Sequence, residues 1–234
     1  MEPGGIFIVI PAYNEAPQVV AEAVRKLRAV PGGAQWQVVV VDDGSQPPLE
    51  KCALGDDGAL TVLRHEINRG QGAALQTGME FAVRCGAAAC VHFDADGQHD
   101  AADVPALLAA LDSGCDVALG SRFMRSADIA AIPPQRRLLL RMARIVNGLL
   151  TGLWLSDAHN GFRALNRNAL AKIHLTEDRM AHASQIMAQI RGSRLRWMEV
   201  PTHVVYSAYS VAKGQRCGNA VNILVDLLLN KLMR

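Results

Sequence analysis

The stretch Val91-His92-Phe93-Asp94-Ala95-Asp96-Gly97-Gln98-His99 decides the fold class of this chain. Its apolar residues predict a buried strand, and that strand ends abruptly in two aspartates one residue apart. In an open α/β sheet, acidic groups at the carboxyl end of a strand lie in the crevice where ligands bind. Carboxylate and amide oxygens suit Mg²⁺ or Mn²⁺, metals that commonly bridge substrate phosphates. Asp94, Asp96 and Gln98 are therefore candidate metal ligands.

Short apolar runs alternate with helical patterns on both sides of this stretch. Strands are predicted at Ile6–Ile10, Trp36–Val41, Leu60–Leu63, Ala89–Phe93 and Asp116–Leu119. Helices are predicted at about Pro17–Arg28, Gly72–Arg84 and Ala102–Leu111. Runs buried on both faces and separated by helices predict an α/β fold, with a mostly parallel central sheet flanked by helices, over about residues 1–125.

The remaining residues, 126–234, change in character but are expected to complete one continuous domain. Helical patterns cover about Pro134–Leu150, Ala181–Ile190 and Asn219–Leu232, and strands are predicted around Pro201 within Arg194–Val205. The last helix is too short to span a bilayer. It could pack on the domain, mediate a homodimer or lie on a membrane.

The helix after Pro134 is basic and amphipathic. At 100° per residue, its arginines fall within about 140° of the helical wheel, and the apolar residues take the opposite side: Leu139, Met142, Ile145, Val146 and Leu149. Such a helix could lie at the interface of an anionic membrane. It could equally pack its apolar side on the core and expose the arginines to solvent.

Composition limits the classes of function. The chain has 234 residues, half of them hydrophobic, and a net charge of +2, which gives no global argument for nucleic acid as a partner. Five cysteines without paired short spacing indicate reduced thiols in a cytoplasmic protein. No secretory signal is recognised, and no apolar run approaches the roughly 20 residues of a spanning helix. We expect a cytoplasmic protein that is soluble or peripheral at the membrane.

Polar loops follow the first two predicted strands. Pro11–Glu15 lacks the glycine pattern of a dinucleotide-binding loop, and it offers a polar and aromatic set that could contact a base and ribose. Its Asn14 could instead cap the next helix. Asp42 and Asp43 could accept from a base and from ribose hydroxyls, or they could simply form an Asp-Gly turn.

Taken together and in order, these motifs resemble the family 2 glycosyltransferases of the GT-A fold, and most of all the polyprenyl-phosphate (dolichyl-phosphate) mannose synthase type. The resemblance covers about residues 5–215 and extends to three further motifs: Gly120-Ser121-Arg122, Asp157-Ala158-His159-Asn160-Gly161-Phe162-Arg163, and Tyr209-Ser210 with Lys213-Gly214.

The resemblance implies roles for individual residues. Asp94, Asp96 and Gln98 would bind Mg²⁺ or Mn²⁺, and Asp96 would be catalytic. Arg122, Arg163 and Lys213 would bind the acceptor or its phosphate, for which guanidinium groups are well suited. The donor nucleotide would be held by Pro11, Tyr13, Asn14, Glu15, Asp42, Asp43, Asp94 and Ala95. His99 would be an outer-shell or acceptor-facing group.

The implied reaction is an inverting, metal-dependent transfer of a sugar from a nucleotide-diphosphate donor to a polyprenyl phosphate or a growing cell-surface glycan. A hydroxyl acceptor requires a general base, whereas a lipid phosphate is already ionised. Asp157 is the preferred base candidate, and Glu177 and Asp178 are alternatives. Asp157 could instead fix the Asn160-Gly161 turn.

Three other functions compete with this interpretation. The chain could transfer a sugar to a soluble or glycan hydroxyl, as in capsule or O-antigen assembly. It could be a sugar nucleotidyltransferase, but that class usually has a glycine-rich basic loop after the first strand, and Pro11–Glu15 does not resemble one. It could also be a non-catalytic nucleotide-sugar-binding protein, which would have no evident need for the Asp94/Asp96 pair.

Overall fold

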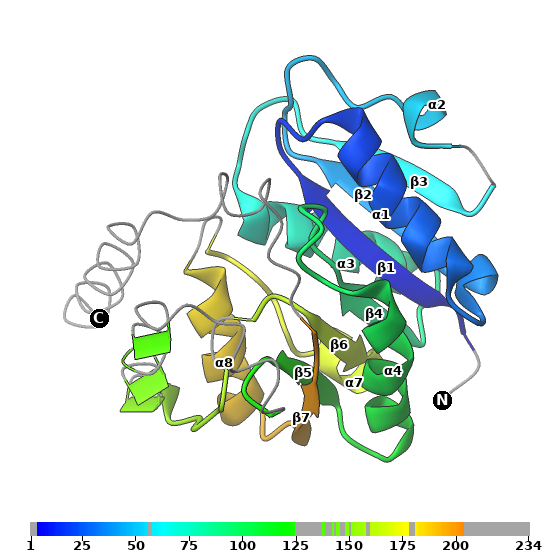
Figure 1. Cartoon of the computed structure of the whole chain (residues 1–234). Coiled ribbons are helices and arrows are strands. Elements are labelled where there is room, and N and C mark those ends of the chain that lie inside the picture. Colours follow the sequence, from blue (N-terminus) through cyan, green and yellow to red (C-terminus); the bar gives the residue numbers. More distant parts are fainter. Residues whose placement is uncertain are drawn as a thin grey trace.

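The computed structural model describes residues 4–55, 58–124, 151–157, 160–177 and 181–203, together with positions 137, 138, 142, 144, 145, 148 and 149. Helices cover both faces of one twisted sheet (Figure 1). The predicted helix at Asn219–Leu232 lies outside the described residues, as does Lys213.

Seven strands form the sheet, in the order β3-β2-β1-β4-β6-β5-β7. The strands are β1 (Ile6–Ala12), β2 (Gln37–Asp42), β3 (Leu60–Arg64), β4 (Ala89–His92), β5 (Val117–Ser121), β6 (Arg163–Asn166) and β7 (Trp197–Pro201). All neighbours pair in parallel except β6, which is antiparallel to both β4 and β5. The predicted α/β fold with a mostly parallel sheet is confirmed.

The strand β6 is the main departure from the sequence-based expectation. Its four residues, Arg-Ala-Leu-Asn, lack the β-branched run that marks the other strands, so the pattern did not predict a strand there. It nevertheless lies inside the sheet, between β4 and β5. Its residue Ala164 pairs with Val91 of β4 on one side and with Ala118 of β5 on the other. A segment from the second half of the chain therefore lies directly beside the strand that carries Asp94.

The helices are α1 (Pro17–Ala29), α2 (Lys51–Leu54), α3 (Gln71–Arg84), α4 (Val104–Asp112), α7 (Arg167–Leu170) and α8 (His182–Gly192). The helices α1, α3, α4 and α8 form where the sequence predicted them, whereas the short helices α2 and α7 were not predicted. Pro17 begins α1, and Lys26 and Arg28 lie in its last turn, where cations interact favourably with the helix dipole. Gly78 lets α3 approach β1 closely, because a Cβ there would collide with Val9.

Two apolar clusters fill the space between the sheet and its helices. Alternating strand residues such as Ile8, Val40 and Val91 pack with α1 and α4, and their neighbours Val9, Val39 and Cys90 pack with α3 and α8. The sheet is therefore buried on both faces, and the open surface near the strands is at their ends.

The basic segment predicted as an amphipathic helix is helical at its described positions between 137 and 151. Four of its described apolar residues are exposed: Leu138, Met142, Ile145 and Leu149 are 62%, 56%, 52% and 67% exposed. These four residues, spaced by four, three and four, form an exposed stripe on one helix face. No helix among the described residues has both the length and the apolar character needed to cross a bilayer.

Candidate active site

The candidate site lies at the carboxyl ends of β1, β2 and β4. In Figure 1 the three strands run side by side, and the loops that follow them gather at one edge of the sheet. Because β1, β2 and β4 are parallel, Tyr13, Asp42 and Asp94 leave the sheet at the same edge.

Asp94 stands at the centre of this edge. Its Oδ1 accepts a hydrogen bond of 3.0 Å from the side-chain amide of Gln71, at the start of α3. Its backbone N–H donates to Nδ1 of His99 at 3.0 Å. Gly161 lies against the same carboxylate, since a Cβ there would be 2.9 Å from Oδ2. Sequence reasoning missed Gln71, although the polar pair Arg69 and Gln71, separated by Gly70 after the third predicted strand, was a usable signal.

Asp96 is joined to Gln98, which donates to the Asp96 carboxylate from its backbone N–H (3.0 Å) and from its side-chain amide (2.6 Å). The Gln98 side chain thus lies beside Asp96 as predicted, but its amide nitrogen, not its oxygen, faces that carboxylate. Oxygen and nitrogen of such an amide exchange places by a half-turn of the group.

The carboxylates at this edge carry excess negative charge. Burial raises the pKa of Asp94, and the nearby charge of Glu15 raises it further, although Arg163 and Gln71 act in the opposite direction. Burial and the charge of Asp94 also raise the pKa of Asp96. Like charges held together are stabilised by a cation. The residues therefore fit a divalent metal, even though no group of three or more His, Cys, Asp or Glu side chains in the described chain has metal-site geometry. Diphosphate oxygens would supply the other ligands, as is usual for Mg²⁺.

His99 is buried at one side of the site and packs against two aromatic rings. Its ring stacks on Phe162 with centroids 4.6 Å apart and packs edge-on against Phe93. Burial lowers the pKa of His99 to about 4, and the charges of Arg122 and Arg163 contribute to that shift. The residue is 7% exposed, and its Nε2 lies 3.6 Å from Oδ2 of Asp94, so His99 holds the Asp94 loop from behind.

The carboxylates of Asp42 and Asp43, which were predicted to contact the nucleoside, are both buried and both have protein partners. Asp42 is fully buried, and its oxygens accept from the N–H groups of Ser45 and Leu49 and from Arg64. Asp43 is 2% exposed and binds the loop after β3 through four hydrogen bonds, donated by His65, Asn68, Arg69 and Gly70. Both carboxylates therefore build the loops that surround the site.

The loop after β1 is held in place by Asn14. This residue has a left-handed backbone (φ 50°), which asparagine tolerates better than most residues. Its N–H donates to Ser45 Oγ, and its Oδ1 accepts from the N–H of Gln46. It does not cap α1, whose N-cap is Ala16. Pro11 and Glu15 are half-buried and Tyr13 is 46% exposed, whereas the Ala95 side chain is buried, leaving only its backbone for a ligand.

Asp157 forms a buried ion pair with Arg122. Both of its oxygens accept hydrogen bonds from Arg122, from Nε at 2.6 Å and from Nη2 at 2.7 Å, and the N–H of Arg122 adds a third. Asp157 is 4% exposed and Arg122 is 6% exposed. Glu199 of β7, which the sequence did not single out, accepts from the N–H groups of Ser156 and Asp157. Both oxygens of Asp157 are thus engaged by Arg122, and its roles as a base or in fixing the Asn160-Gly161 turn stay predictions.

Arg163, which was predicted to face the acceptor, is buried in this structure. It is 1% exposed and donates to the carbonyls of Gly161 and Asn160 at 3.2 and 3.1 Å. Burial lowers its pKa to about 10, and the nearby Asp94 partly offsets that effect. Arg163 therefore lies under the site, where it holds the loop before β6 and places positive charge near Asp94. The alternative base Glu177 is half-buried before α8, and Asp178 is outside the described residues.

Comparison with known proteins agrees with this geometry. The profile described as "Glycosyl transferase family 2" matches residues 7–174. The crystal structure of glucosyl-3-phosphoglycerate synthase from Mycobacterium tuberculosis, with Mn²⁺ and UDP-glucose, superimposes with a TM-score of 0.66 at 19% identity, covering 99% of this chain and 79% of the other. The fold is therefore the GT-A fold, and the chain belongs to glycosyl transferase family 2. It is a glycosyltransferase.

The names of two relatives describe the transfer of sugars to polyprenyl carriers. Polyprenol monophosphomannose synthase of Mycolicibacterium smegmatis is 33% identical over 173 residues, which cover 72% of this chain and 64% of the relative. UDP-N-acetylglucosamine–dolichyl-phosphate N-acetylglucosaminyltransferase of Methanococcus voltae is 26% identical over 97% of this chain and 96% of the relative. An uncharacterised protein of Methanocaldococcus jannaschii is 32% identical over 97% of this chain and 92% of its own length.

Proposed function

We propose that the protein transfers a sugar from a nucleoside-diphosphate donor to a polyprenyl phosphate at a membrane surface, with Mg²⁺ or Mn²⁺ bound by Asp94 and Asp96. Gln98 would join the metal ligands after a half-turn of its amide. Tyr13, Glu15 and the backbone of Ala95 would contact the nucleotide, and Lys213 would bind phosphate.

The observation that carries the choice of acceptor is the Arg122–Asp157 pair. A hydroxyl acceptor must lose its proton during the reaction, and a base must be within hydrogen-bond reach. Asp157, the best base candidate in the sequence, is committed to Arg122. A phosphate monoester is ionised at neutral pH and needs no base. The charge of Arg122 helps to lower the pKa of His99, so Arg122 places positive charge near the loop of Asp94 and Asp96.

The chemistry then requires little from the protein beyond positioning and charge. A phosphate oxygen of the acceptor forms a bond to the anomeric carbon while the bond from that carbon to the donor diphosphate breaks, and the nucleoside diphosphate leaves. The metal, when bound, supplies the positive charge that stabilises this leaving group. Gln71 holds Asp94 by a hydrogen bond and Arg163 places positive charge near it, while His99 with Phe162 closes one side of the site.

Peripheral membrane contact is the second part of the proposal. The exposed stripe of Leu138, Met142, Ile145 and Leu149 supports it, because a core-packed helix would bury these residues. Arg144 is exposed on the same helical segment, and arginines beside an apolar stripe are attracted to anionic lipid. The polyprenyl acceptors in the names of the two characterised relatives agree with a bilayer partner.

The test is a matrix of donors and acceptors. Purified protein with Mn²⁺ or Mg²⁺ is given a panel of radiolabelled sugar nucleotides, each with a short-chain prenyl phosphate, the corresponding prenol, or a glycan hydroxyl. Transfer to the prenyl phosphate and not to the prenol supports the proposal. Transfer to a hydroxyl that is lost in Glu177→Gln would favour the glycan alternative, with Glu177 as its base.

A further inference from the structure

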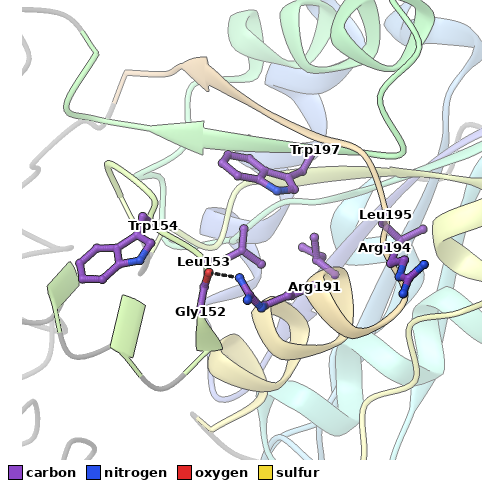
Figure 2. Close-up of a pocket in the computed structure, with 8 residues that line it drawn as sticks. Gly152, Leu153, Trp154, Arg191, Arg194, Leu195 and Trp197 are labelled. Atoms are coloured by element: carbon purple, nitrogen blue, oxygen red, sulfur yellow. Dashed lines mark hydrogen bonds between the residues drawn. The ribbon is translucent and has the colours of Figure 1, made fainter.

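A cavity of about 410 Å³ lies far from the transfer site, between the end of α8 and the start of β7. Figure 2 shows Trp154 and Trp197 reaching it from different segments, with Arg191 beside Gly152 and Arg194 farther to the right. Trp197 begins β7, and β7 runs parallel to β5. The cavity is therefore at the amino-terminal ends of these strands, opposite the edge that carries Asp94.

Both tryptophans are unusually open to solvent. Trp154 is 56% exposed, Trp197 is 39% exposed, and Met198 beside it on the edge strand is 45% exposed. Trp36, the third tryptophan of the chain, is 4% exposed and belongs to the core. Tryptophan has an apolar body and one polar N–H, which suits the boundary between a bilayer and water.

The cavity also has positive charge without a carboxylate partner. Arg191 donates to the carbonyl of Gly152, and within the described chain neither Arg191 nor Arg194 forms an ion pair. Arg194 has a left-handed backbone (φ 51°). It follows the C-cap of α8 in a Schellman motif, in which the N–H of Leu195 donates to the carbonyl of Ile190 and the N–H of Arg194 to that of Arg191. Glycine is the usual residue at this position. The chain nevertheless has an arginine there, in a backbone conformation that disfavours a side chain.

The cavity continues the exposed stripe. Trp154 packs against the stripe's helix at Gly148, where a Cβ would lie 2.7 Å from the indole ring. From Leu138 to Leu149 the stripe is about 16 Å long at 1.5 Å per residue, and the cavity lies beyond its carboxyl end. The exposed stripe and Trp154 thus belong to one stretch of chain, and the end of α8 and the start of β7 bring Arg191, Arg194 and Trp197 to the cavity beside it.

We propose that this cavity binds the phosphate headgroup of an anionic phospholipid and forms a second membrane contact, separate from the acceptor site. The inference rests on the proposed function, because it takes the membrane-facing enzyme as its starting point. Arg191 and Arg194 bind the headgroup phosphate, and Trp154 and Trp197 lie at the level of the glycerol backbone. The chain is then held at two places, and the anionic surface fixes its orientation.

Vesicle sedimentation and tryptophan quenching test this site. Wild-type protein should bind phosphatidylcholine vesicles that contain phosphatidylglycerol, and brominated phosphatidylglycerol should quench part of its fluorescence. Trp154→Phe and Trp197→Phe should each lose part of that quenching, while Trp36 stays unquenched. The Arg191→Gln/Arg194→Gly variant should bind these vesicles about 30-fold more weakly, given about 1 kcal/mol per arginine near an anionic surface. Its melting temperature should not fall on account of Arg194→Gly, because glycine suits that backbone.

Arg25→Gln/Arg84→Gln is the matched control, since it removes two exposed arginines from α1 and α3. An equal loss of vesicle binding in this control would overturn the site. So would vesicle binding of wild-type protein without any quenching. A rise in melting temperature with glycerol 3-phosphate alone, absent in Arg194→Gly, would assign the cavity to a soluble phosphate and also overturn the inference.

Transfer to a short, water-soluble prenyl phosphate without vesicles separates this inference from the proposed function. The cavity variants should retain that transfer at the wild-type rate, because none of their residues lies at the Asp94 edge. Wild-type protein that lacks the transfer but shows arginine-dependent vesicle binding would refute the proposed acceptor and leave the lipid site standing.

Discussion

The carboxylate of Asp157 and the guanidinium of Arg122 form a bidentate pair across 35 positions of sequence, with two side-chain hydrogen bonds of 2.6 and 2.7 Å. The pair joins the end of β5 to the loop that precedes β6. Buried pairs of this kind are costly to break on one side, because the remaining charge stays without a partner.

Asp157→Asn should therefore lower the free energy of unfolding by about 3 kcal/mol. Arg122→Leu/Asp157→Leu should recover most of that loss, since no buried charge remains, but it should not transfer sugar. Urea denaturation and a transfer assay measure the two effects. An Asp157→Asn protein of wild-type stability whose activity returns at high pH would reinstate Asp157 as a base.

Asp96→Asn should abolish transfer and metal-dependent donor binding without destabilising the metal-free protein. Burial and the charge of Asp94 both disfavour the ionised form of Asp96, so the neutral amide relieves repulsion. Thermal melts in EDTA and in Mn²⁺ test this directly. Mn²⁺ should raise the melting temperature of the wild type alone, and an equal rise in the variant would remove Asp96 from the metal site.

Gln71→Ala should weaken Mn²⁺ binding about 10-fold, the lower end of the usual effect of removing a group that orients a metal ligand. The amide fixes Oδ1 of Asp94 and favours its ionised form. Isothermal titration with Mn²⁺ provides the measurement, with Gln18→Ala on the exposed face of α1 as control. Equal affinities in both variants would show that the Gln71 contact has no part in metal binding.

Met142→Gln/Ile145→Gln/Leu149→Gln should reduce binding to anionic vesicles at least about 100-fold. Each substitution should change the free energy of unfolding by no more than about 0.5 kcal/mol, as expected for exposed positions. A loss of 2–5 kcal/mol per site would instead indicate core packing. The control is Ile67→Gln/Val83→Gln, which changes two exposed apolar residues outside the stripe. Ile67 is 71% exposed and Val83 is 50% exposed.

Stability should fall as pH decreases from about 6.5 toward 4, in part through His99. The pKa of His99 is lowered to about 4 by burial, so the unfolded chain takes up this proton first. Between the two pKa values the folded state loses about 3 kcal/mol relative to the unfolded state. His99→Phe keeps the stack on Phe162 and should flatten the slope of unfolding free energy against pH. An unchanged slope would mean that His99 has the same pKa in the folded protein as in the unfolded chain.

Most strands and the longer helices could be predicted because their residue patterns are distinctive. Continuous apolar, β-branched runs mark β1 and β2, and Pro17 marks the start of α1. The strand β6 could not be found in this way. Arg163 is buried there by the neighbouring strands and by the carbonyls of Asn160 and Gly161, a setting that only the tertiary structure provides.

The candidate site was predicted at the correct edge of the sheet but not in its detail. Asp42, Asp43, Asp94 and Asp96 look alike in sequence, since each follows an apolar run. What separates them are partners from elsewhere in the chain, such as Arg64 for Asp42 and the 68–70 loop for Asp43. A carboxylate with such partners organises a loop, whereas Asp96 is joined to its near neighbour Gln98 and lies close to the charge of Asp94.

The position of β6 has a consequence for how this protein can be divided. The strand β5 belongs to the first half of the chain, yet both of its neighbours, β6 and β7, come from the second half. A fragment ending near residue 125 would leave β5 without a partner and would open the edge of β4 beside Asp94. Chimeras that exchange acceptor specificity between relatives should therefore keep residues 117–121, 163–166 and 197–201 from a single parent, and recombine only in the loops between them.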